Sequence, residues 1–318
     1  MTDAYAEHLA GLHASFAAPR EMIVAAAREV TASPLMDTER LVHGEANEVY
    51  RLAFENGVCL ILRIARRGEG RFEKEAFAIG RCRALGVAAP EVLSIQTRET
   101  TGAALELCFM ERIAGERLSD RSDLPREVLR EIVREVGDQL SRIHTIGAED
   151  LGEGARLFAD DTDDFLALRA EFESLGVQAG LAPRALDRAF AAYERTLGDA
   201  AAPPRRVLTH NDLRACHVMV HEGRLSGLID FGEVSLDSPI NEFAKWDYWE
   251  APDLPVGWLR EGYRHEGLFD ADFAPRFEAL RIANALWALR WYALTAFRPG
   301  VARAVAKLEG YLAEAGMA

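Results

Sequence analysis

The spacing of apolar residues changes along the chain, and each change predicts a different kind of secondary structure. In residues 39–67 the apolar positions form strand-like runs on both sides of Asn56-Gly57, a pair that favours a β-hairpin turn. Two more strands are expected in 91–97 and 104–113, joined by a polar turn at 98–102. Short strands are also expected in 207–210, 217–223 and 224–230, around polar loops.

Helical spacing occupies the other segments. It covers residues 1–35, 70–85, 126–145, 161–175 and 183–197, and the chain from Pro239 onward. After the N-terminal helices, the order predicted for the first part of the chain is therefore β-β-β-α-β-β. Strands first and helices later are typical of α+β proteins. We place a boundary between Ile113 and Leu118 and expect two lobes, 1–114 and 115–318.

Charge narrows the choice of partner only a little. The formal net charge of −14 and the pI near 5.1 argue against nucleic acid, because binding a polyanion needs clustered Lys and Arg. A cationic small molecule would fit this charge. A net negative charge is also a common solubility feature, so it does not identify a substrate by itself.

Cysteine usage and the N-terminal residues indicate the compartment. The sequence has no CxxC pair, which argues against a zinc ribbon and a disulfide framework. The N-terminus carries acids and histidines where an export signal has a basic start and an apolar run. Apolar stretches such as 58–65 are far shorter than the roughly 20 residues of a membrane helix. We therefore expect a cytoplasmic protein with reduced thiols and no membrane partner.

Two aspartates follow successive predicted strands in the second half of the chain. Asp212 lies in the stretch HNDLRACH, residues 210–217, and Asp230 lies in IDFGE, residues 229–233. Phosphoryl transfer needs one carboxylate to accept the proton of the attacking hydroxyl and another to hold the metal that bridges the phosphates. Such pairs also occur in ordinary turns, but two in this order and spacing favour a catalytic centre.

The two stretches together resemble a known family. An H-x-D loop followed by D-F-G is the paired signature of protein-kinase-like enzymes. HND with His217 resembles the 2''-aminoglycoside and macrolide phosphotransferases, and IDFGEVSLDSPINEFAKW resembles the hygromycin phosphotransferases. The resemblance to the aminoglycoside phosphotransferase family implies a bilobal kinase-like fold, with an antiparallel sheet in a small N-terminal nucleotide-binding lobe and a larger, mainly helical C-terminal lobe. It also implies that Asp212 is the catalytic base and Asp230 a metal ligand.

His217 departs from the asparagine usual at its position. Magnesium prefers oxygen donors, whereas imidazole suits softer divalent ions. His217 either ligates the metal through nitrogen or orders the loop, and its spacing from Asp212 favours the ligand role. His210 is expected to be structural rather than catalytic.

The same resemblance places a nucleotide site in the first lobe, for ATP or GTP with two Mg²⁺ ions. Residues 43–47 resemble a shortened phosphate loop, although a plain hairpin turn explains them equally well. Arg63 stands where kinases carry a phosphate-binding lysine, and its alternative is a surface-facing strand arginine. Glu75 is its expected ion-pair partner, with Glu73 second, and 109–113 resembles the hinge that binds the purine. The expected nucleotide contacts are Gly44, Asn47, Arg63, Glu75, Met110, Glu111 and Ile113.

Acceptor recognition is expected in the helical lobe after Asp230. Carboxylates there would pair with ammonium groups, and indole rings would cover sugar faces. Packing is the stronger explanation for each of Trp246, Trp249, Trp287 and Trp291, and loop support is the stronger one for Asp237, Ser238 and Glu242. The candidate acceptor contacts are Glu233, Asp237, Glu242, Trp246 and Glu250.

These observations predict a kinase that moves the γ-phosphoryl group of ATP or GTP to a hydroxyl of a small, cationic molecule such as an aminoglycoside or aminocyclitol. A metabolite kinase of the choline, homoserine, methylthioribose or fructosamine type is the alternative within the fold. Two further alternatives are a non-catalytic nucleotide-binding regulator that keeps the kinase fold, and a metal-dependent phosphohydrolase that uses the same carboxylates on water. The protein is expected to be a monomer or a homodimer.

Overall fold

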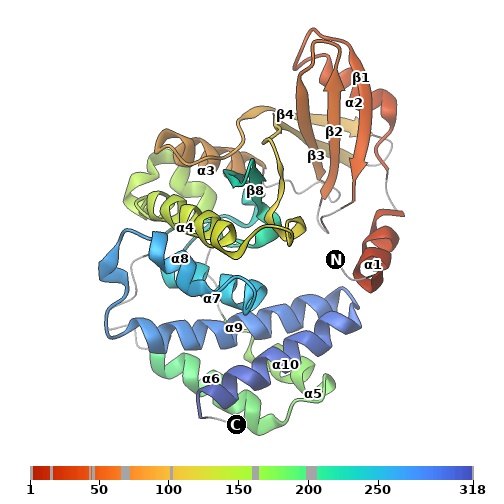
Figure 1. Ribbon diagram of the computed structural model, residues 1–318. Helices are drawn as coiled ribbons and strands as arrows, with labels where there is room; N and C mark the ends of the chain where they lie inside the picture. The colour runs from red at the N-terminus through yellow and green to blue at the C-terminus, as the bar shows by residue number, and fades with distance from the viewer. Residues whose placement is uncertain are drawn as a thin grey trace. The chain divides into compact units, whose positions relative to one another are not determined.

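The computed structural model describes residues 3–14, 17–42, 44, 47–65, 72–100, 103–159, 165–197 and 206–316. The chain divides into two compact units (Figure 1). The first comprises residues 1–115 together with 226–232, and the second comprises 116–225 and 233–318. Nothing in the sequence pattern indicated that 226–232 belongs with the first unit. The expected functional lobes, 1–114 and 115–318, stay a prediction.

The first unit is built on a five-stranded antiparallel sheet in the order β1-β2-β3-β5-β4. The strands are β1 (Leu35–Leu41), β2 (Asn47–Phe54), β3 (Cys59–Ala65), β4 (Val92–Thr100) and β5 (Ala103–Glu111). The predicted hairpin at Asn56-Gly57 is confirmed. Gly57 has φ +82°, which a residue without a Cβ adopts at little cost, and the Asn56 side chain accepts the Val58 N–H at 3.1 Å.

Helices cover both faces of this sheet. The alternation of β2, β3 and β5 puts Leu52, Leu62 and Phe109 in one core with α2 (Arg20–Ala27), which Figure 1 shows beside the strands. On the other face Phe72, the first residue of α3 (Phe72–Ala84), packs with Cys108. Arg63 lies on this second face. A further helix, α1 (Asp3–Ala14), precedes α2, and the predicted order β-β-β-α-β-β is confirmed.

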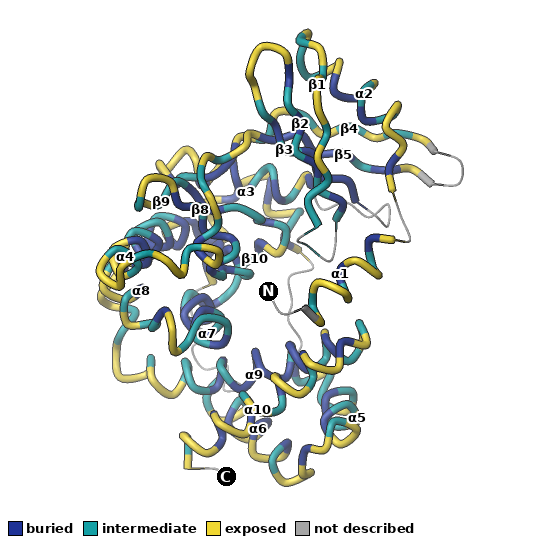
Figure 2. The backbone as a smooth tube through the Cα atoms, turned by 45° about the vertical axis from the view of Figure 1, so that its right-hand side comes forward, coloured by how far each residue is buried: buried dark blue, intermediate teal, exposed yellow. Residues whose placement is uncertain are grey.

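The second unit is mainly helical, which confirms the α+β prediction. Its helix α9 packs against α6, α7 and α10, and Figure 2 shows buried residues along it. The helix predicted at 161–175 overlaps α5, but its predicted start is wrong, because residues 165–168 form turns and α5 begins at Arg169. Residues 161–164 of that prediction lie outside the described residues. None of the described helices is long and apolar enough to cross a membrane. The helices are α4 (Arg126–Ile143), α5 (Arg169–Gln178), α6 (Pro183–Leu197), α7 (Pro239–Glu250), α8 (Val256–Gly262), α9 (Phe273–Leu294) and α10 (Arg298–Glu314).

Short strands of the second unit flank the loops that contain predicted site residues. β7 (Val207–Thr209) pairs with β10 (Ser235–Asp237), and β6 (Glu116–Arg117) pairs with β8 (Val218–His221). The remaining strand, β9 (Arg224–Leu228), follows β8 and leads into the segment that belongs to the first unit.

Two glycines allow α4 and α8 to cross at close range. A Cβ on Gly137 of α4 would lie 2.1 Å from the Leu259 carbonyl oxygen, and a Cβ on Gly262 of α8 would lie 1.8 Å from that of Arg134. Real Cβ atoms do not come this close to backbone. Both glycines are therefore required by the helix contact.

Replacing Gly137 by alanine should lower the free energy of unfolding by roughly 1–3 kcal/mol, because the new methyl group overpacks the crossing. Gly257→Ala is the matched control, since Gly257 lies in α8 with nothing within 4 Å of its Cβ position. That control should be neutral or should stabilise by up to about 1 kcal/mol through helix propensity. Urea unfolding of both variants measures the difference, and equal effects would contradict the close crossing.

Candidate functional site

The loop that carries Asp212 begins directly after strand β7. His210 is completely buried, and its Nδ1 accepts the Asp212 N–H at 3.4 Å. Between them Asn211 has φ +61°, a left-handed conformation that asparagine tolerates better than most residues. Asp212 itself is partly exposed. The loop therefore leaves the Asp212 carboxylate partly exposed next to a buried histidine, and the expected structural role of His210 fits this geometry.

Acidic and basic side chains of helix α7 hold this loop by hydrogen bonds. Glu242 accepts the Asn211 N–H at 2.5 Å, and Lys245 Nζ donates to the Asn211 backbone oxygen at 2.6 Å. Lys245 also donates to the Asn211 side-chain oxygen at 2.5 Å. One turn further, Glu250 accepts the Ala215 N–H at 2.8 Å. Three side chains of one helix thus fix the backbone on both sides of Asp212.

Burial raises the pKa of two of the acidic side chains that support this loop. Burial raises the pKa of Glu242 to about 7, against the Asn211 N–H and the charge of Lys245, which favour the ionised form. Burial also raises the pKa of Glu250, while its hydrogen bond from Ala215 and the charge of Arg214 work in the opposite direction. Glu242 is therefore partly protonated near neutral pH.

His217 is buried behind the same loop. Its Nδ1 lies 2.7 Å from the backbone oxygen of Asp212, and a carbonyl oxygen can only accept, so Nδ1 carries the proton. The lone pair of the neutral ring is then on Nε2. Metal-bound histidines commonly have this arrangement, with the other ring nitrogen donating to a carbonyl or carboxylate. His217 orders the loop in this structure, and its Nε2 has the chemistry of a ligand.

Arg214 lies between the Asp212 carboxylate and an aromatic ring. Its Nε is 3.3 Å from Asp212 Oδ1, and its guanidinium lies 4.6 Å from the ring centre of Trp249. Arg303 of α10 lies 5.1 Å from the same ring centre. Neither Arg214 nor Lys245 was among the site residues predicted from the sequence. A signal for Lys245 was present, since it follows Glu242 by three residues on the same helix.

In the first unit Arg63 is the centre of a buried charge cluster. Its guanidinium donates to Glu75 of α3 and, at 2.9 Å, to Asp230 Oδ1. Arg63 and Glu75 are 8% and 2% exposed. The predicted ion pair of Arg63 with Glu75 is therefore present, and the alternative of a surface-facing strand arginine is wrong.

The electrostatics of this cluster follow from its burial. Burial acts to lower the pKa of Arg63, but the negative charges of Glu75 and Asp230 outweigh it and raise that pKa. Burial raises the pKa of Glu75, and the charge of Arg63 opposes the rise. Arg63 is thus a permanent cation whose charge is balanced by two carboxylates.

Two hydrogen bonds to backbone oxygens, one from a side chain and one from a backbone N–H, hold the segment before Asp230 in the first unit. Ser226 Oγ donates to the Ala114 oxygen at 2.6 Å, and the Leu228 N–H donates to the Ala88 oxygen at 2.8 Å. Asp230 then adopts φ +65°. A Cβ on Gly232 would lie 3.3 Å from Arg63 Nη2, so the glycine leaves room for the ion pair.

The other predicted nucleotide contacts lie at the start of β2 and around the end of β5. Gly44 precedes β2 and Asn47 is its first residue, whereas 43, 45 and 46 lie outside the described residues. Met110 is buried in β5, and the Glu111 N–H donates to the Glu91 oxygen at 2.8 Å. Ile113 follows the strand and is half-buried. The N–H of Glu111 is thus already used by the protein.

The structure corrects two of the candidate acceptor contacts. Trp246 is completely buried and donates its indole N–H to the Leu254 oxygen at 2.9 Å, and Glu242 is 1% exposed. Packing explains the first, as expected for the tryptophans, and loop support explains the second. Asp237 accepts the Ser238 N–H at 2.6 Å and the Asn241 side-chain amide, so it supports the start of α7, whose N-cap is Ser238. Glu233 is exposed and Glu250 is half-buried.

Trp287 and Trp291 differ in how much of each side chain is exposed. Trp287 packs against Phe172 with ring centres 5.2 Å apart, which agrees with the packing expectation. Trp291 is 49% exposed, so packing does not explain it.

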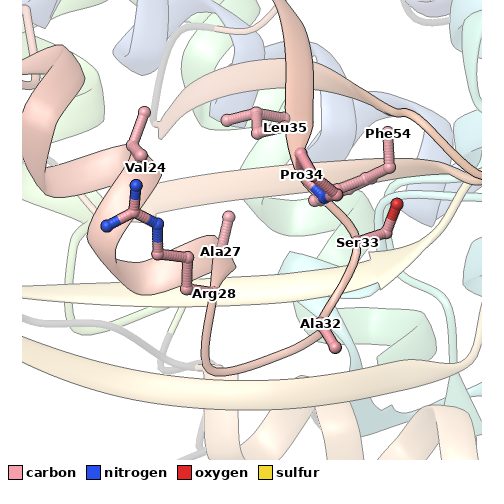
Figure 3. A pocket seen from close by; sticks show the side chains of 8 residues that line it. All are labelled: Val24, Ala27, Arg28, Ala32, Ser33, Pro34, Leu35 and Phe54. Carbon is pink, nitrogen blue, oxygen red and sulfur yellow. The ribbon is translucent and has the colours of Figure 1, made fainter.

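A hollow of about 300 Å³ lies elsewhere in the first unit, between α2 and the start of β1. Figure 3 shows Val24 and Arg28 on the helix side, and Pro34, Leu35 and Phe54 opposite. None of the predicted site residues lines it, and its only charged group is Arg28. The hollow therefore offers no group for phosphoryl transfer.

Comparison with known proteins identifies the family. The model of the Phosphotransferase enzyme family matches residues 37–275, which is more than half of the chain. No curated protein is similar enough in sequence to count as a match.

Solved structures share the fold at low sequence identity. The apo form of a thermostable mutant of aminoglycoside phosphotransferase APH(4)-Ia is 21% identical over 90% of this chain and 97% of that chain, with a TM-score of 0.67. The GDP complex of wild-type aminoglycoside 2'-phosphotransferase-IIIa is 15% identical over 93% and 97%, with a TM-score of 0.72. The GDP and kanamycin complex of APH(2")-IIIa is 16% identical over 88% and 94%, with a TM-score of 0.66. These similarities confirm the predicted bilobal fold class, and the family match shows that this chain belongs to the Phosphotransferase enzyme family.

Proposed function

We propose that this protein transfers the γ-phosphoryl group of ATP or GTP to a hydroxyl group of a small molecule, most specifically an aminoglycoside, an aminocyclitol or a related antibiotic. The observation that carries the proposal is the buried Arg63, which bonds both Glu75 and Asp230. A cation fixed by a helix carboxylate is the device with which kinases hold nucleotide phosphates. The family match supports phosphotransfer as the reaction class.

Asp212 is the proposed catalytic base. Its carboxylate accepts the proton of the acceptor hydroxyl as that oxygen attacks the γ-phosphorus, and the nucleoside diphosphate leaves. Geometry favours Asp212 over its neighbours, because it is partly exposed while His210 and Glu242 are buried. The hydrogen bonds from α7 hold its backbone, so little ordering is needed when the substrates bind.

The nucleotide contacts are proposed in the first unit. Arg63 binds phosphate oxygens, the backbone at Gly44 and Asn47 approaches the phosphates, and the hinge binds the purine. Because the Glu111 N–H is already bonded to Glu91, we assign the N–H donor to the purine to Ile113, and Met110 and Glu111 stay proposed hinge contacts.

The proposed metal ligands are Asp230 and His217, and two Mg²⁺ ions are expected in the complex. Asp230 supplies the hard carboxylate oxygen that Mg²⁺ prefers, whereas the Nε2 of His217 suits a softer divalent ion better. Bound Mg²⁺ would neutralise charge on the transferring phosphoryl group. The role of the chain is to hold Asp230 by Arg63 and His217 by the Asp212 carbonyl.

The proposed class of acceptor is inferred from the ligands in solved structures of similar proteins. A thermostable APH(4)-Ia variant is known in a ternary complex with AMP-PNP and hygromycin B, and APH(2")-IIIa is known with GDP and kanamycin. Glu233, Asp237 and Glu250 stay as proposed contacts for a cationic acceptor. A cytoplasmic location would give access to nucleotide.

A nucleotide-consumption assay tests the proposal. ATP and GTP are offered with Mg²⁺ and with aminoglycosides, hygromycin-type aminocyclitols, macrolides and metabolite alcohols such as choline or homoserine. Turnover that depends on an antibiotic supports the proposal, and turnover only with a metabolite would assign a metabolite kinase. Phosphate release without any acceptor would indicate a hydrolase. Nucleotide binding without turnover would indicate a regulator.

Asp212→Asn should lower turnover by about 100- to 10,000-fold and leave nucleotide affinity unchanged, because it removes the proton acceptor alone. The control is Asp253→Asn, an exposed acid after α7, which should keep normal turnover. Steady-state kinetics and nucleotide titration measure both variants. Unchanged turnover in Asp212→Asn would remove Asp212 from its role.

Arg63→Met should destabilise the protein by roughly 3–5 kcal/mol, because it leaves the buried Glu75 carboxylate without its cation. The double variant Arg63→Met/Glu75→Leu should regain most of this stability, since no buried charge is left unpaired. Neither variant should bind nucleotide. Chemical unfolding with nucleotide titration separates the two effects, and a double variant that binds ATP normally would refute the phosphate-binding role.

Glu242→Gln should change how stability depends on pH. The folded protein raises the Glu242 pKa from 4.5 to about 7, so it favours the protonated form, and stability is lost as pH rises from about 4.5 through 7. Relative to Glu242→Gln, the unsubstituted protein should lose roughly 3 kcal/mol over this range, at 1.36 kcal/mol for each unit. Asp237 and Asp212 add negative charge near Glu242 and Lys245 opposes them. Unfolding free energies measured between pH 4 and 8 check this, with the exposed Glu266→Gln as control; parallel curves would contradict it.

A further inference from the structure

The last helix, α10, lies outside the part of the chain that defines the family. The family model ends at residue 275, whereas α10 begins at Arg298. Arg303, Lys307 and Tyr311 follow one another at intervals of four residues, so they lie on one face of this helix. Each of the three contacts α7 or the residue after it, and α7 is the helix that holds the Asp212 loop.

Hydrogen bonds and an ion-pair bridge link α10 to the end of α7. The Tyr311 hydroxyl donates to Asp247 Oδ2 at 3.4 Å, and Lys307 Nζ donates at 3.4 Å to the backbone oxygen of the residue after α7. Arg281 of α9 joins the two helices, because it lies 2.8 Å from Asp247 of α7 and 2.8 Å from Glu314 of α10. The position of α10 against α7 therefore does not depend on Trp249.

Trp249 contacts both α10 and the Asp212 loop. Its ring centre is 5.1 Å from the guanidinium of Arg303 and 4.6 Å from that of Arg214. Guanidinium groups at such distances are attracted by the quadrupole of the indole ring. The side chain of Trp249 is half-buried, and the next residue, Glu250, bonds the backbone of the same loop. One ring thus serves two arginines from distant parts of the chain.

Arg214 transmits this contact to the proposed base. Its Nε is 3.3 Å from Asp212 Oδ1, and the side chains of Arg214 and Asp212 are 26% and 28% exposed. An ion pair with this exposure is weak by itself, because solvent screens it and a free arginine side chain has roughly 2 kcal/mol of rotamer entropy to lose. The indole of Trp249 restricts the guanidinium before any pairing occurs. The orientation of the Asp212 carboxylate therefore depends on Trp249.

We propose that Trp249 is a positioning residue that holds Arg214 against the Asp212 carboxylate, and that α10 completes this support through Arg303. A carboxylate that is oriented before the acceptor binds has less to rearrange when the hydroxyl attacks, and this lowers the barrier to transfer. Packing alone does not explain a half-buried ring beside two guanidinium groups. The inference rests on the proposed function, since it assigns a support to the proposed base.

Variants of the full chain separate an aromatic contact from simple packing. Trp249→Leu keeps an apolar side chain but removes the aromatic face, whereas Trp249→Phe keeps such a face. Arg214→Met removes the guanidinium, and the double variant Arg214→Met/Trp249→Leu tests whether the two residues act as one. The matched control is Trp258→Leu, which breaks a similar pair, since Trp258 of α8 has its ring centre 4.7 Å from the guanidinium of Arg126.

A second pair of variants tests the part played by α10. Arg303→Met removes the guanidinium beside Trp249, and Arg298→Met changes an exposed arginine at the start of the same helix as its control. Single-turnover rates with ATP or GTP, Mg²⁺ and the acceptor of the panel above that has the highest turnover measure transfer apart from product release. Steady-state kinetics give the acceptor KM, nucleotide titrations give the Kd, and thermal unfolding verifies that each variant is folded.

Trp249→Leu should slow transfer about three- to thirtyfold, the effect of losing one cation–π contact. Trp249→Phe should stay within about threefold of the unsubstituted protein, and Arg303→Met should slow transfer about two- to fivefold. The nucleotide Kd and the acceptor KM should change by less than about twofold, because Trp249 acts on the base and not on binding. Both control variants should transfer at the normal rate.

The double variant should be no slower than Arg214→Met alone, because Trp249 acts through Arg214. Additive losses in the double variant, equal losses in Trp249→Phe and Trp249→Leu, or normal transfer in folded Trp249→Leu would overturn the inference while Asp212→Asn stays inactive. A normal rate in Arg303→Met would remove α10 from the support. If no acceptor of the panel is phosphorylated, or if Asp212→Asn transfers normally, the proposed function fails and the inference fails with it.

Discussion

The buried ion-pair cluster of Arg63 is the constraint on which the rest of the site depends. A guanidinium inside a protein must have its charge balanced, because water is not there to do it. Glu75 and Asp230 provide this balance from a helix and from a segment more than 150 residues later in the chain. The cluster thus explains why residues 226–232 belong with the first unit, and why a glycine follows Phe231 at a position where a Cβ would crowd the guanidinium.

The Asp212 loop is constrained in a different way. Its backbone is held in an unfavourable conformation by hydrogen bonds from helix α7, not by a buried ion pair. Asn211 has a positive φ, and Glu242 and Lys245 compensate by bonding its N–H and both of its oxygens. The supporting groups are buried below the loop, which leaves the Asp212 carboxylate partly exposed. Strain that is held by a rigid helix in this way is a means of presenting a reactive group without mobility.

Several features of the site could be predicted because they depend on local chemistry. The Asn56-Gly57 turn needs a residue that tolerates positive φ, and the alternation of β2 and β3 follows from one covered face. Glu75 was the expected partner of Arg63 because the stretch that it leads into resembles the family, and the structure places it in the first turn of α3. Helix α5 was misplaced because apolar spacing alone does not show where a helix begins without a capping signal.

The sequence by itself predicted which residues carry the proposed chemistry. The HND loop, the DFG-like stretch and the strand arginine are local patterns, and their order does not depend on packing. Only the tertiary structure decided which acidic and aromatic side chains support the site and which face solvent. Glu242 and Trp246 are buried, Glu233 is exposed, and Trp249 lies beside guanidinium groups from two distant elements. The reason is physical, because burial and the pairing of charges are set by elements that are distant in sequence, and local periodicity contains no information about them.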